Sequence, residues 1–236
     1  MSAGRLFLLP APLSEDTPPQ DVVPASVLER IRALERFVAE NAKSARAWLA
    51  ACGHPKPIRE IAISELNEHT PAAEVPALLG PLLEGHDVGL LSEAGMPAVA
   101  DPGALLVAAA HAKGVVVVPC VGPSSILLAL AASGLDGQRF RFVGYLPADA
   151  TARRDALLEL EKRSARDRET QVFIETPYRN DAMLAEIVKS CRASTRVAVA
   201  AELTSPRESV VMDTVSGWKR RAATIGKRPA IFLLLA

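Results

Sequence analysis

The sequence lacks several features that mark specialised classes of protein. Its 236 residues include only three cysteines and four histidines, widely spaced, which form neither a disulfide framework nor a zinc-ligand pattern. The formal net charge is zero, so no global field draws the chain to nucleic acid or to an anionic membrane. No apolar run approaches the roughly 18 residues of a membrane-spanning helix. These absences predict a cytoplasmic protein with no membrane partner and no metal site.

Three common motifs are also missing. The first apolar run is followed by PAPLSE and not by Gly-x-Gly-x-x-Gly, so the dinucleotide-binding fingerprint of the Rossmann fold is absent. The chain has no Gly-x-x-x-x-Gly-Lys-[Ser/Thr] run, which argues against P-loop phosphate chemistry. The segment GPSSI does not match the Gly-x-Ser-x-Gly nucleophile elbow of hydrolases.

What the chain does have is an alternation of short apolar runs with helical patterns. The runs expected to be strands are 5–10, 87–92, 115–119, 140–145, 170–175, 196–202, 208–213 and 230–236. The expected helices are 103–114, 124–134, 151–167 and a segment near 179–191. Residues 27–52 fit either one long helix or two short helices around a strand at RFVAEN.

This alternation predicts an α/β fold. We expect two α/β domains, residues 1–119 with a mostly parallel sheet and residues 120–236 with a mixed sheet. The β-branched run VVVVP at 115–119 is typical of a central parallel strand covered on both faces.

Four loops rich in glycine, proline and polar residues follow predicted strands. They are PAPLSEDTP (10–18), SEAGMPAVADPG (92–103), CVGPSS (120–125) and ETPYRN (175–180). Glycine and proline give such loops a fixed shape that exposes backbone N–H and C=O groups. One loop of this kind usually does no more than end a strand. Four of them predict a ligand site at one shared edge, because ligands of open α/β sheets bind beyond the carboxyl ends of the strands.

Four motifs, in this order, carry a family resemblance: GLLSEAGMPAVADPG, VVVVPCVGPSSILLALAASGL, RFVGYLPA and VFIETPYRN. They resemble the tetrapyrrole (corrin/porphyrin) methylase superfamily, the class III S-adenosylmethionine-dependent methyltransferases. Their order and spacing are nearest the branch of the 16S ribosomal RNA cytidine 2′-O-ribose methyltransferases. The resemblance implies a homodimeric methyltransferase with S-adenosylmethionine as cofactor in a cleft between its two domains.

The resemblance also implies which residues contact the cofactor. Backbone carbonyl groups suit the sulfonium cation and N–H groups suit the methionine carboxylate, so mainly backbone and packing contacts are expected. The residues that match the family motifs are Leu13, Ser92, Glu93, Ala94, Met96, Ser125, Ile126, Thr176, Pro177, Leu203 and Pro229.

The chain departs from the ribosomal RNA branch at three places. Glu93 stands where the branch has aspartate, and Glu40-Asn41-Ala42-Lys43 where it has Glu-Asp-Thr-Arg. Ser64 and Leu66 stand where it carries two histidines. A ribose hydroxyl must lose its proton during transfer, and histidine is the usual base, so the loss of both histidines weakens the assignment of an RNA acceptor.

Three other residues are candidates for the catalytic base. His69 stands three positions beyond Leu66, although an ordinary surface histidine explains it better. Glu175 and Tyr178 are equally well explained as residues that fix their loop.

The methyl acceptor stays open at this stage. The motif set favours RNA, and a tetrapyrrole or other small molecule is the alternative. A third reading is a protein that binds S-adenosylmethionine without catalysis, which the departures motivate. The segment GWKRRAATIGKR (217–228) holds five basic residues beside Trp218 and is either a grip for a phosphate backbone or a solvated helix before the last strand.

Overall fold

The computed structural model describes residues 3–221 and 223–236. The chain forms two compact units, Met1–Ser124 and Ser125–Ala236. Within the described residues, no helix is both long enough and apolar enough to cross a membrane. The α/β class, with one parallel and one mixed sheet, is confirmed.

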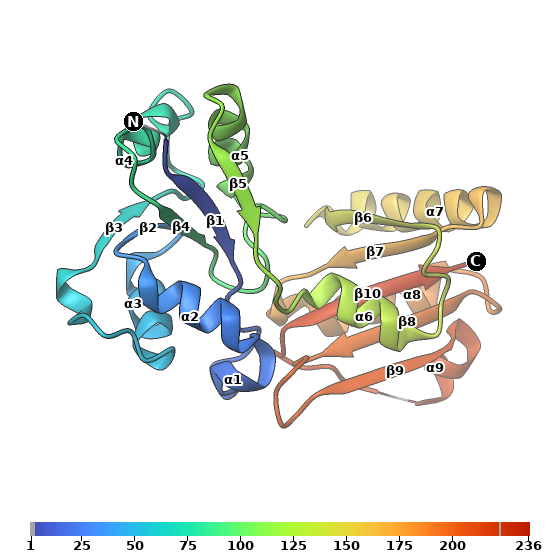
Figure 1. Ribbon diagram of the computed structural model, residues 1–236. Coiled ribbons are helices and arrows are strands. Elements are labelled where there is room, and N and C mark those ends of the chain that lie inside the picture. Colours follow the sequence, from blue (N-terminus) through green and yellow to red (C-terminus); the bar gives the residue numbers. More distant parts are fainter. Residues whose placement is uncertain (1–2, 222) are drawn as a thin grey trace. The chain divides into compact units, whose positions relative to one another are not determined.

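The first unit is built on a parallel sheet of five strands (Figure 1). The strands are β1 (Arg5–Leu9), β2 (Arg36–Ala39), β3 (Ala62–Glu65), β4 (Val88–Leu91) and β5 (Val116–Pro119). Their order is β3-β2-β4-β1-β5, and each neighbouring pair is parallel. All five carboxyl ends therefore lie at one edge of this sheet, which gathers the loops that follow the strands.

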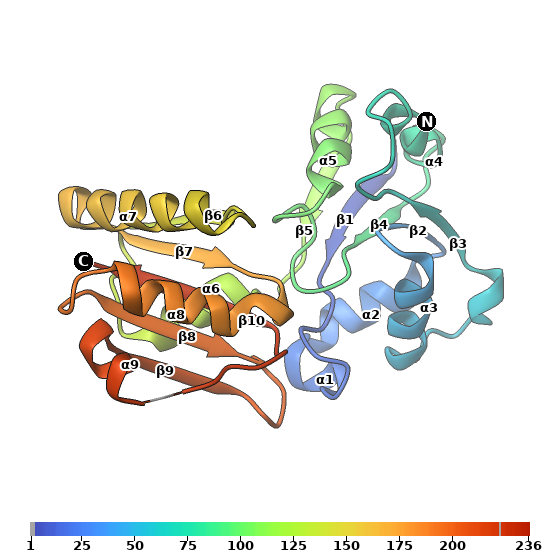
Figure 2. The same ribbon diagram turned by 180° about the vertical axis from the view of Figure 1, so that it is seen from behind.

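Helices cover both faces of the first sheet (Figure 2). They are α1 (Pro19–Val22), α2 (Ala25–Ala33), α3 (Ala42–Ala51), α4 (Gly80–Leu83) and α5 (Gly103–Ala112), with 3-10 turns η1 (Ile58–Glu60) and η2 (Val75–Leu79). On one face α2 and α3 pack on Phe7 and Phe37, and on the other α5, α4 and η2 pack on Leu6 and Leu90. Covering both faces lets a parallel sheet bury its apolar side chains.

Two expectations for this unit are settled by the structure, and one further strand was not expected. Residues 27–52 form two helices around a strand, the second of the two alternatives. The run 115–119 is an edge strand and not a central one, and Val116 is 59% exposed, because β5 pairs only with β1. Strand β3 was not expected, since its sequence AISE has little apolar content and is mostly exposed.

The second unit has a mixed sheet of five strands in the order β6-β7-β10-β8-β9. Its strands are β6 (Phe140–Tyr145), β7 (Thr170–Ile174), β8 (Arg196–Ala201), β9 (Ser209–Thr214) and β10 (Ala230–Leu235). Only β6 and β7 are parallel. Strand β10 runs antiparallel between β7 and β8 and places Phe232 opposite Phe173, whose rings stack with centroids 5.6 Å apart.

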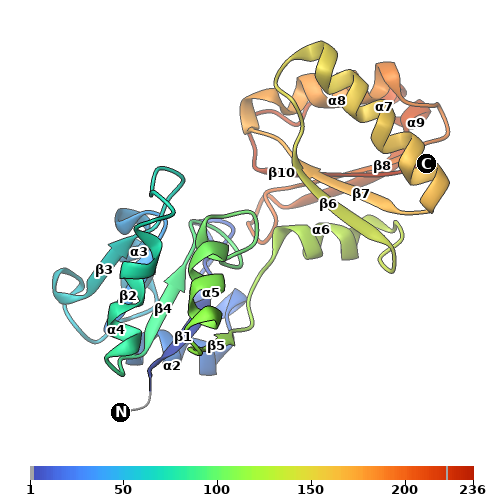
Figure 3. The same cartoon turned by 90° about the horizontal axis from the view of Figure 1, so that it is seen from above.

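Helices lie on both faces of the second sheet as well, as Figure 3 shows. They are α6 (Ser125–Ser133), α7 (Ala150–Asp167), α8 (Asn180–Ser190) and α9 (Val215–Arg221), with a 3-10 turn η3 (Pro177–Arg179). Helix α6 covers one face, and α7, α8 and α9 cover the other around a core that includes Leu157, Ile187 and Trp218. The expected strands and helices of this half match the observed ones closely.

Candidate functional site

The loops that follow β1 and β4 are joined at the carboxyl edge of the first sheet. The N–H of Ala11 donates to the carbonyl of Gly95 at 2.8 Å, and the N–H of Gly95 donates back at 3.1 Å. Gly95 has φ of +73°, a conformation that favours glycine. The bridge ties the predicted cofactor loop around Ser92 to the loop that carries Leu13.

The loop after β5 approaches the loop after β1 very closely. A Cβ atom on Gly122 would lie 2.1 Å from the Cβ of Pro10, so only glycine fits there. Three of the four predicted loops therefore meet at one edge. The fourth, 175–180, follows β7 in the other sheet, so the expectation of one edge shared by all four loops was wrong.

Asp101 holds the second half of the loop after β4 in shape. Its carboxylate accepts the N–H of Ala98 at 2.9 Å and the N–H of Gly103, the first residue of α5, at 2.7 Å. Ala98 and Ala100 have φ of 65° and 60°, unusual values for residues other than glycine. Strain of this kind persists only where the surroundings fix the backbone, and it is concentrated at functional sites.

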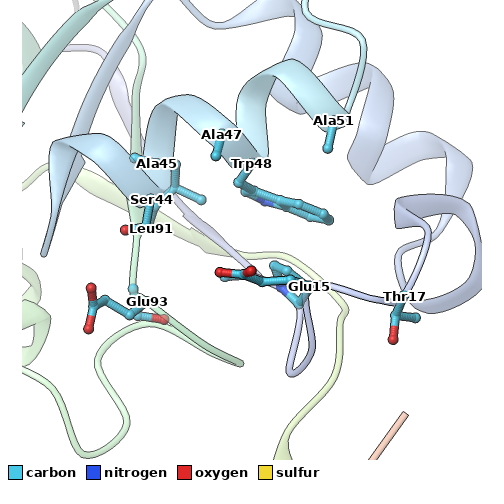
Figure 4. A pocket seen from close by; sticks show the side chains of 12 residues that line it. Glu15, Thr17, Ser44, Ala45, Ala47, Trp48, Ala51, Leu91 and Glu93 are labelled. Carbon is cyan, nitrogen blue, oxygen red and sulfur yellow. The ribbon is translucent and has the colours of Figure 1, made fainter. Parts of the chain in front are cut away.

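A pocket of about 290 Å³ opens at this edge of the first sheet. Helix α3 forms one wall, with the indole of Trp48 projecting from it, and Glu15 and Glu93 lie on the side opposite (Figure 4). The lining residues are Ala11, Pro12, Glu15, Thr17, Ser44, Ala45, Ala47, Trp48, Ala51, Leu91, Ser92 and Glu93. They combine an apolar wall with two carboxylates and include no lysine or arginine.

Trp48 is 7% exposed, and its indole N–H finds no acceptor in the part of the chain that the structure describes. A buried donor without a partner costs about 1–3 kcal/mol, so packing alone holds this side chain in place. Aromatic residues are few in the sequence, and the helical spacing around Trp48 gave no signal that it borders a pocket.

Carboxylates accumulate beside the pocket. Oε2 of Glu40, directly after β2, accepts the N–H of Glu93, the second residue after β4, at 3.4 Å. Partial burial raises the pKa of Glu40; the N–H of Glu93 opposes this, and the charges of Asp101, Glu93 and Glu68 raise the pKa further. A carboxylate with a raised pKa is a stronger base. Glu40 was not among the predicted catalytic candidates. The signal that could have identified it is its match to the glutamate of the Glu-Asp-Thr-Arg motif of the related branch.

The departure at Asn41 has a structural role. Its Oδ1 caps α3 by accepting the N–H groups of Lys43 at 2.8 Å and Ser44 at 3.3 Å. Oε1 of Glu65, at the end of β3, accepts the N–H of Ala42 at 3.0 Å. The altered motif thus fixes the beginning of the helix that carries Trp48.

The histidine candidate lies in solvent. The side chain of His69 is 85% exposed and stands 3.6 Å from the carboxylate of Glu68. Its backbone N–H is held by Oδ1 of Asn67 at 3.0 Å. These contacts match the description of an ordinary surface histidine.

In the second unit, Glu175 directly follows β7 and is a buried carboxylate. Its Oε1 accepts Nε of Arg179 at 2.8 Å, the N–H of Thr176 at 2.7 Å and the hydroxyl of Thr176 at 3.2 Å. Its Oε2 has no hydrogen-bond partner among the described residues. Tyr178 is 71% exposed and lies under the guanidinium of Arg179, so the two catalytic candidates of this loop differ sharply in their surroundings.

The loops around β8 and β10 bring two predicted cofactor residues together. The N–H of Glu202, beside Leu203, donates to the carbonyl of Pro229 at 2.9 Å. Glu202 itself has φ of 50° and is paired with Arg207 at 2.9 Å. Because β10 lies between β7 and β8, these residues share the edge of the second sheet where Thr176 and Pro177 also stand.

The predicted cofactor residues therefore form a group in each unit. Leu13, Ser92, Glu93, Ala94 and Met96 lie in the joined loops of the first unit. In the second unit, Thr176, Pro177, Leu203 and Pro229 lie in the loops at one sheet edge, and Ser125 and Ile126 begin α6. Their contact with a cofactor, and the predicted cleft, stay predictions.

In the basic segment 217–228, Trp218 offers no surface to a phosphate backbone, and two of the five basic residues have partners within the protein. Trp218 is 5% exposed, and its Nε1 donates to the carbonyl of Val197 at 2.9 Å, so it belongs to the core. Arg221 pairs with Asp213 at 2.8 Å, and Nε of Arg228 donates to the carbonyl of Ile225 at 2.7 Å. Across residues 3–221 and 223–236, no cluster of three or more histidine, cysteine or acidic side chains is arranged to hold a metal ion.

Comparison with known proteins identifies the class. The chain shares its fold with solved tetrapyrrole methylases: the methyltransferase CobJ (TM-score 0.64, 17% identity, 98% of this chain and 94% of that one) and the cobalt precorrin-4 methyltransferase CbiF (TM-score 0.59, 19% identity, 98% and 94%). The model of the family Tetrapyrrole (Corrin/Porphyrin) Methylases matches residues 11–217. The chain belongs to this family and is an S-adenosylmethionine-dependent methyltransferase.

Its curated relatives bear a more specific name. The protein called Ribosomal RNA small subunit methyltransferase I is 37% identical over 194 residues in Xylella fastidiosa (82% of this chain and 67% of the relative). The protein of that name from Escherichia coli O157:H7 is 32% identical over 209 residues (89% and 68%). The chain thus spans about two thirds of the length of these relatives.

Proposed function

We propose that this methyltransferase acts on the RNA of the small ribosomal subunit, at a ribose 2′-hydroxyl. The observation that carries the proposal is the similarity to relatives named for that RNA, at 37% and 32% identity over most of the chain. The tetrapyrrole methylases are related at 17–19% identity, which supports a common fold and no common acceptor.

The residues at the two sheet edges suit S-adenosylmethionine, whose sulfonium and ammonium groups are cationic. In the first unit, the raised pKa of Glu40 reflects partial burial together with the negative charges of Asp101, Glu93 and Glu68, which favour a cation nearby. In the second unit, the buried Oε2 of Glu175 has no donor among the described residues and would accept an N–H group. We propose that the predicted cofactor residues of each unit contact the cofactor through their loops.

When bound, S-adenosylmethionine supplies an activated methyl group. The protein's part is to align the acceptor oxygen, to exclude water and to take the hydroxyl proton. We assign the proton to Glu40, whose raised pKa makes its carboxylate more basic and whose Oε2 stands 3.4 Å from the N–H of Glu93. With the cofactor bound, its methyl group would pass to the hydroxyl oxygen, and the carboxylate of Glu40 would take the hydroxyl proton.

The test combines cofactor binding with methyl transfer. Calorimetry with S-adenosylmethionine is expected to show binding that Ala94→Trp and Ser125→Trp each weaken at least tenfold. Ala104→Trp, a substitution of an exposed residue on α5 outside the predicted site, is expected to leave binding unchanged.

Purified small ribosomal subunits lacking the modification are then incubated with labelled cofactor. Incorporation of label at a ribose 2′-oxygen is expected, with Glu40→Gln at least tenfold slower and cofactor affinity retained. Label in a tetrapyrrole and none in RNA would overturn the proposal. Cofactor binding without transfer to either acceptor would support the non-catalytic binding protein instead.

The proposal includes the predicted location in the cytoplasm and the predicted homodimer. An acceptor on the ribosome requires the protein in the cytoplasm, where that RNA is assembled. A homodimer is the expected assembly of the family, and sedimentation analysis of the full chain tests it.

A further inference from the structure

The pocket beside α3 has no assigned role in the reaction as proposed so far. It lies at the carboxyl edge of the first sheet, and Ser92 and Glu93 form part of its lining. The remaining lining residues include Glu15, Trp48 and Ala51, none of which belongs to the predicted cofactor set. The pocket therefore extends from the predicted cofactor loop toward α3.

The chemistry of the lining limits what the pocket can hold. Glu15 and Glu93 accept hydrogen bonds, and no lysine or arginine among the lining residues could neutralise an acid. A phosphate or a carboxylate-bearing macrocycle is therefore disfavoured by its charge. A ligand that donates hydrogen bonds is favoured.

The size of the pocket and its apolar wall indicate what kind of ligand it can hold. A volume of about 290 Å³ lies at the lower end of the range for small-molecule sites, which is enough for one ring system and too little for a tetrapyrrole. The exposed side chains of Ala47 and Ala51 on α3 offer an apolar wall for a flat ring, and the small exposed part of Trp48 completes this wall (Figure 4). Enzymes that modify nucleic acids commonly hold an unstacked base between apolar side chains and read its polar edge.

We propose that this pocket binds an unstacked nucleobase that carries an exocyclic amino group, at or beside the methylated nucleotide. The amino group donates to the carboxylate of Glu15, as carboxylates accept from the amino group of cytosine in other complexes. Ala47, Ala51 and the small exposed part of Trp48 contribute the apolar wall against which the base lies. The proposal rests on the proposed function, because it names the part of the RNA acceptor that the site recognises.

The first experiment needs no methyl transfer. The two indole N–H signals of the ¹⁵N-labelled protein, Trp48 and Trp218, are followed by NMR during titration with cytidine, adenosine or uridine; Trp218, buried in the second unit, is the internal control. Cytidine and adenosine are expected to shift the Trp48 signal, each with a Kd at least fivefold lower than that of uridine. Uridine carries a carbonyl in place of the amino group. Equal affinity for cytidine and uridine, or no shift of Trp48 with any nucleoside, would overturn the proposal.

Matched variants locate the site. Ala51→Leu fills the pocket from its exposed rim, whereas Ala50→Leu adds the same atoms to an exposed position of α3 outside the lining. Glu15→Gln removes the proposed acceptor charge, with Glu29→Gln on α2 as its control. Ala51→Leu is expected to abolish the cytidine shift and Glu15→Gln to weaken it at least fivefold, while both controls bind as the parent protein does.

The adenine of S-adenosylmethionine carries the same kind of amino group and is the rival occupant. Two measurements on Ala51→Leu distinguish the cofactor's adenine from a base of the RNA. Calorimetry is expected to show an unchanged Kd for S-adenosylmethionine, and methylation assays are expected to show a KM for ribosomal subunits that is at least tenfold higher. A tenfold weaker Kd for the cofactor in Ala51→Leu would assign the pocket to the cofactor and overturn the proposal. If the parent protein methylates no RNA, the proposed function fails, and the nucleoside titration still decides what the pocket binds.

Discussion

Oε2 of Glu40 accepts the backbone N–H of Glu93 at 3.4 Å and so connects the loops that follow β2 and β4. Partial burial and neighbouring carboxylates raise the pKa of Glu40. The charged form is therefore less favourable in the folded protein than in the unfolded chain.

This raised pKa predicts how stability depends on pH. The contribution of Glu40 is favourable below its ordinary pKa and is lost as pH rises through the raised value. Glu40→Gln keeps an acceptor for the N–H of Glu93 and removes the charge, so at pH 7 it should raise the free energy of unfolding, by less than about 1 kcal/mol after solvent screening. The gain should vanish below pH 4, as urea unfolding at both pH values would show. An equal effect at both would contradict the assignment.

The two tryptophans offer a matched comparison, since both are almost completely buried. Trp218→Phe removes a donor that binds the carbonyl of Val197 at 2.9 Å, whereas Trp48→Phe removes a donor without an acceptor in the described structure. Each substitution is expected to affect the free energy of unfolding of the unit that contains it. We expect the loss for Trp218→Phe to exceed the loss for Trp48→Phe by about 1 kcal/mol. Urea unfolding followed by hydrogen exchange in each unit measures both, and equal losses would refute the comparison.

Gly122 is predicted to be irreplaceable. A Cβ atom there would stand 2.1 Å from the Cβ of Pro10, so Gly122→Ala should force the loops after β5 and β1 apart, lower stability by about 1–3 kcal/mol and weaken S-adenosylmethionine binding. Gly137→Ala meets no atom within 4 Å and should change stability by less than about 0.5 kcal/mol. Thermal unfolding and calorimetry of both variants provide the measurement. Normal cofactor binding by Gly122→Ala would show that the loops do not need this close approach.

The three cysteines should react in a definite order. Burial raises the pKa of Cys52 and of Cys191 to about 12, and both thiols are shielded from solvent. Burial also raises the pKa of Cys120, which is the more accessible thiol at the end of β5. Since the thiolate is the reactive form, a maleimide at pH 8 should label Cys120 first and the other two only after unfolding. Peptide mass spectrometry reads the order, and early labelling of Cys52 would contradict it.

The sequence was most informative where local signals agreed. The runs at 140–145, 170–175, 196–202 and 230–236 became strands because they are apolar or β-branched and are bounded by turns. The strand at 62–65 escaped notice, since AISE has no such pattern and forms a strand only because β2 is there to pair with it.

At the candidate site, too, local sequence predicted some features and missed others. Glycine and proline marked the loops after β1, β4 and β5, and the structure joins these three. The loop 175–180 carries the same signal but follows a strand of the other sheet. Local sequence gives the ends of strands, and it does not say which strands share a sheet.

The sequence by itself determined the alternation of strands and helices, the family and the loops that border the site, because these depend on neighbouring residues and on ordered motifs. Only the tertiary structure decided that β5 is an edge strand, that Trp218 is core, and that Glu15, Trp48 and Glu93 line one pocket. These outcomes depend on pairing and packing between segments far apart in the chain, and no local pattern of residues encodes them.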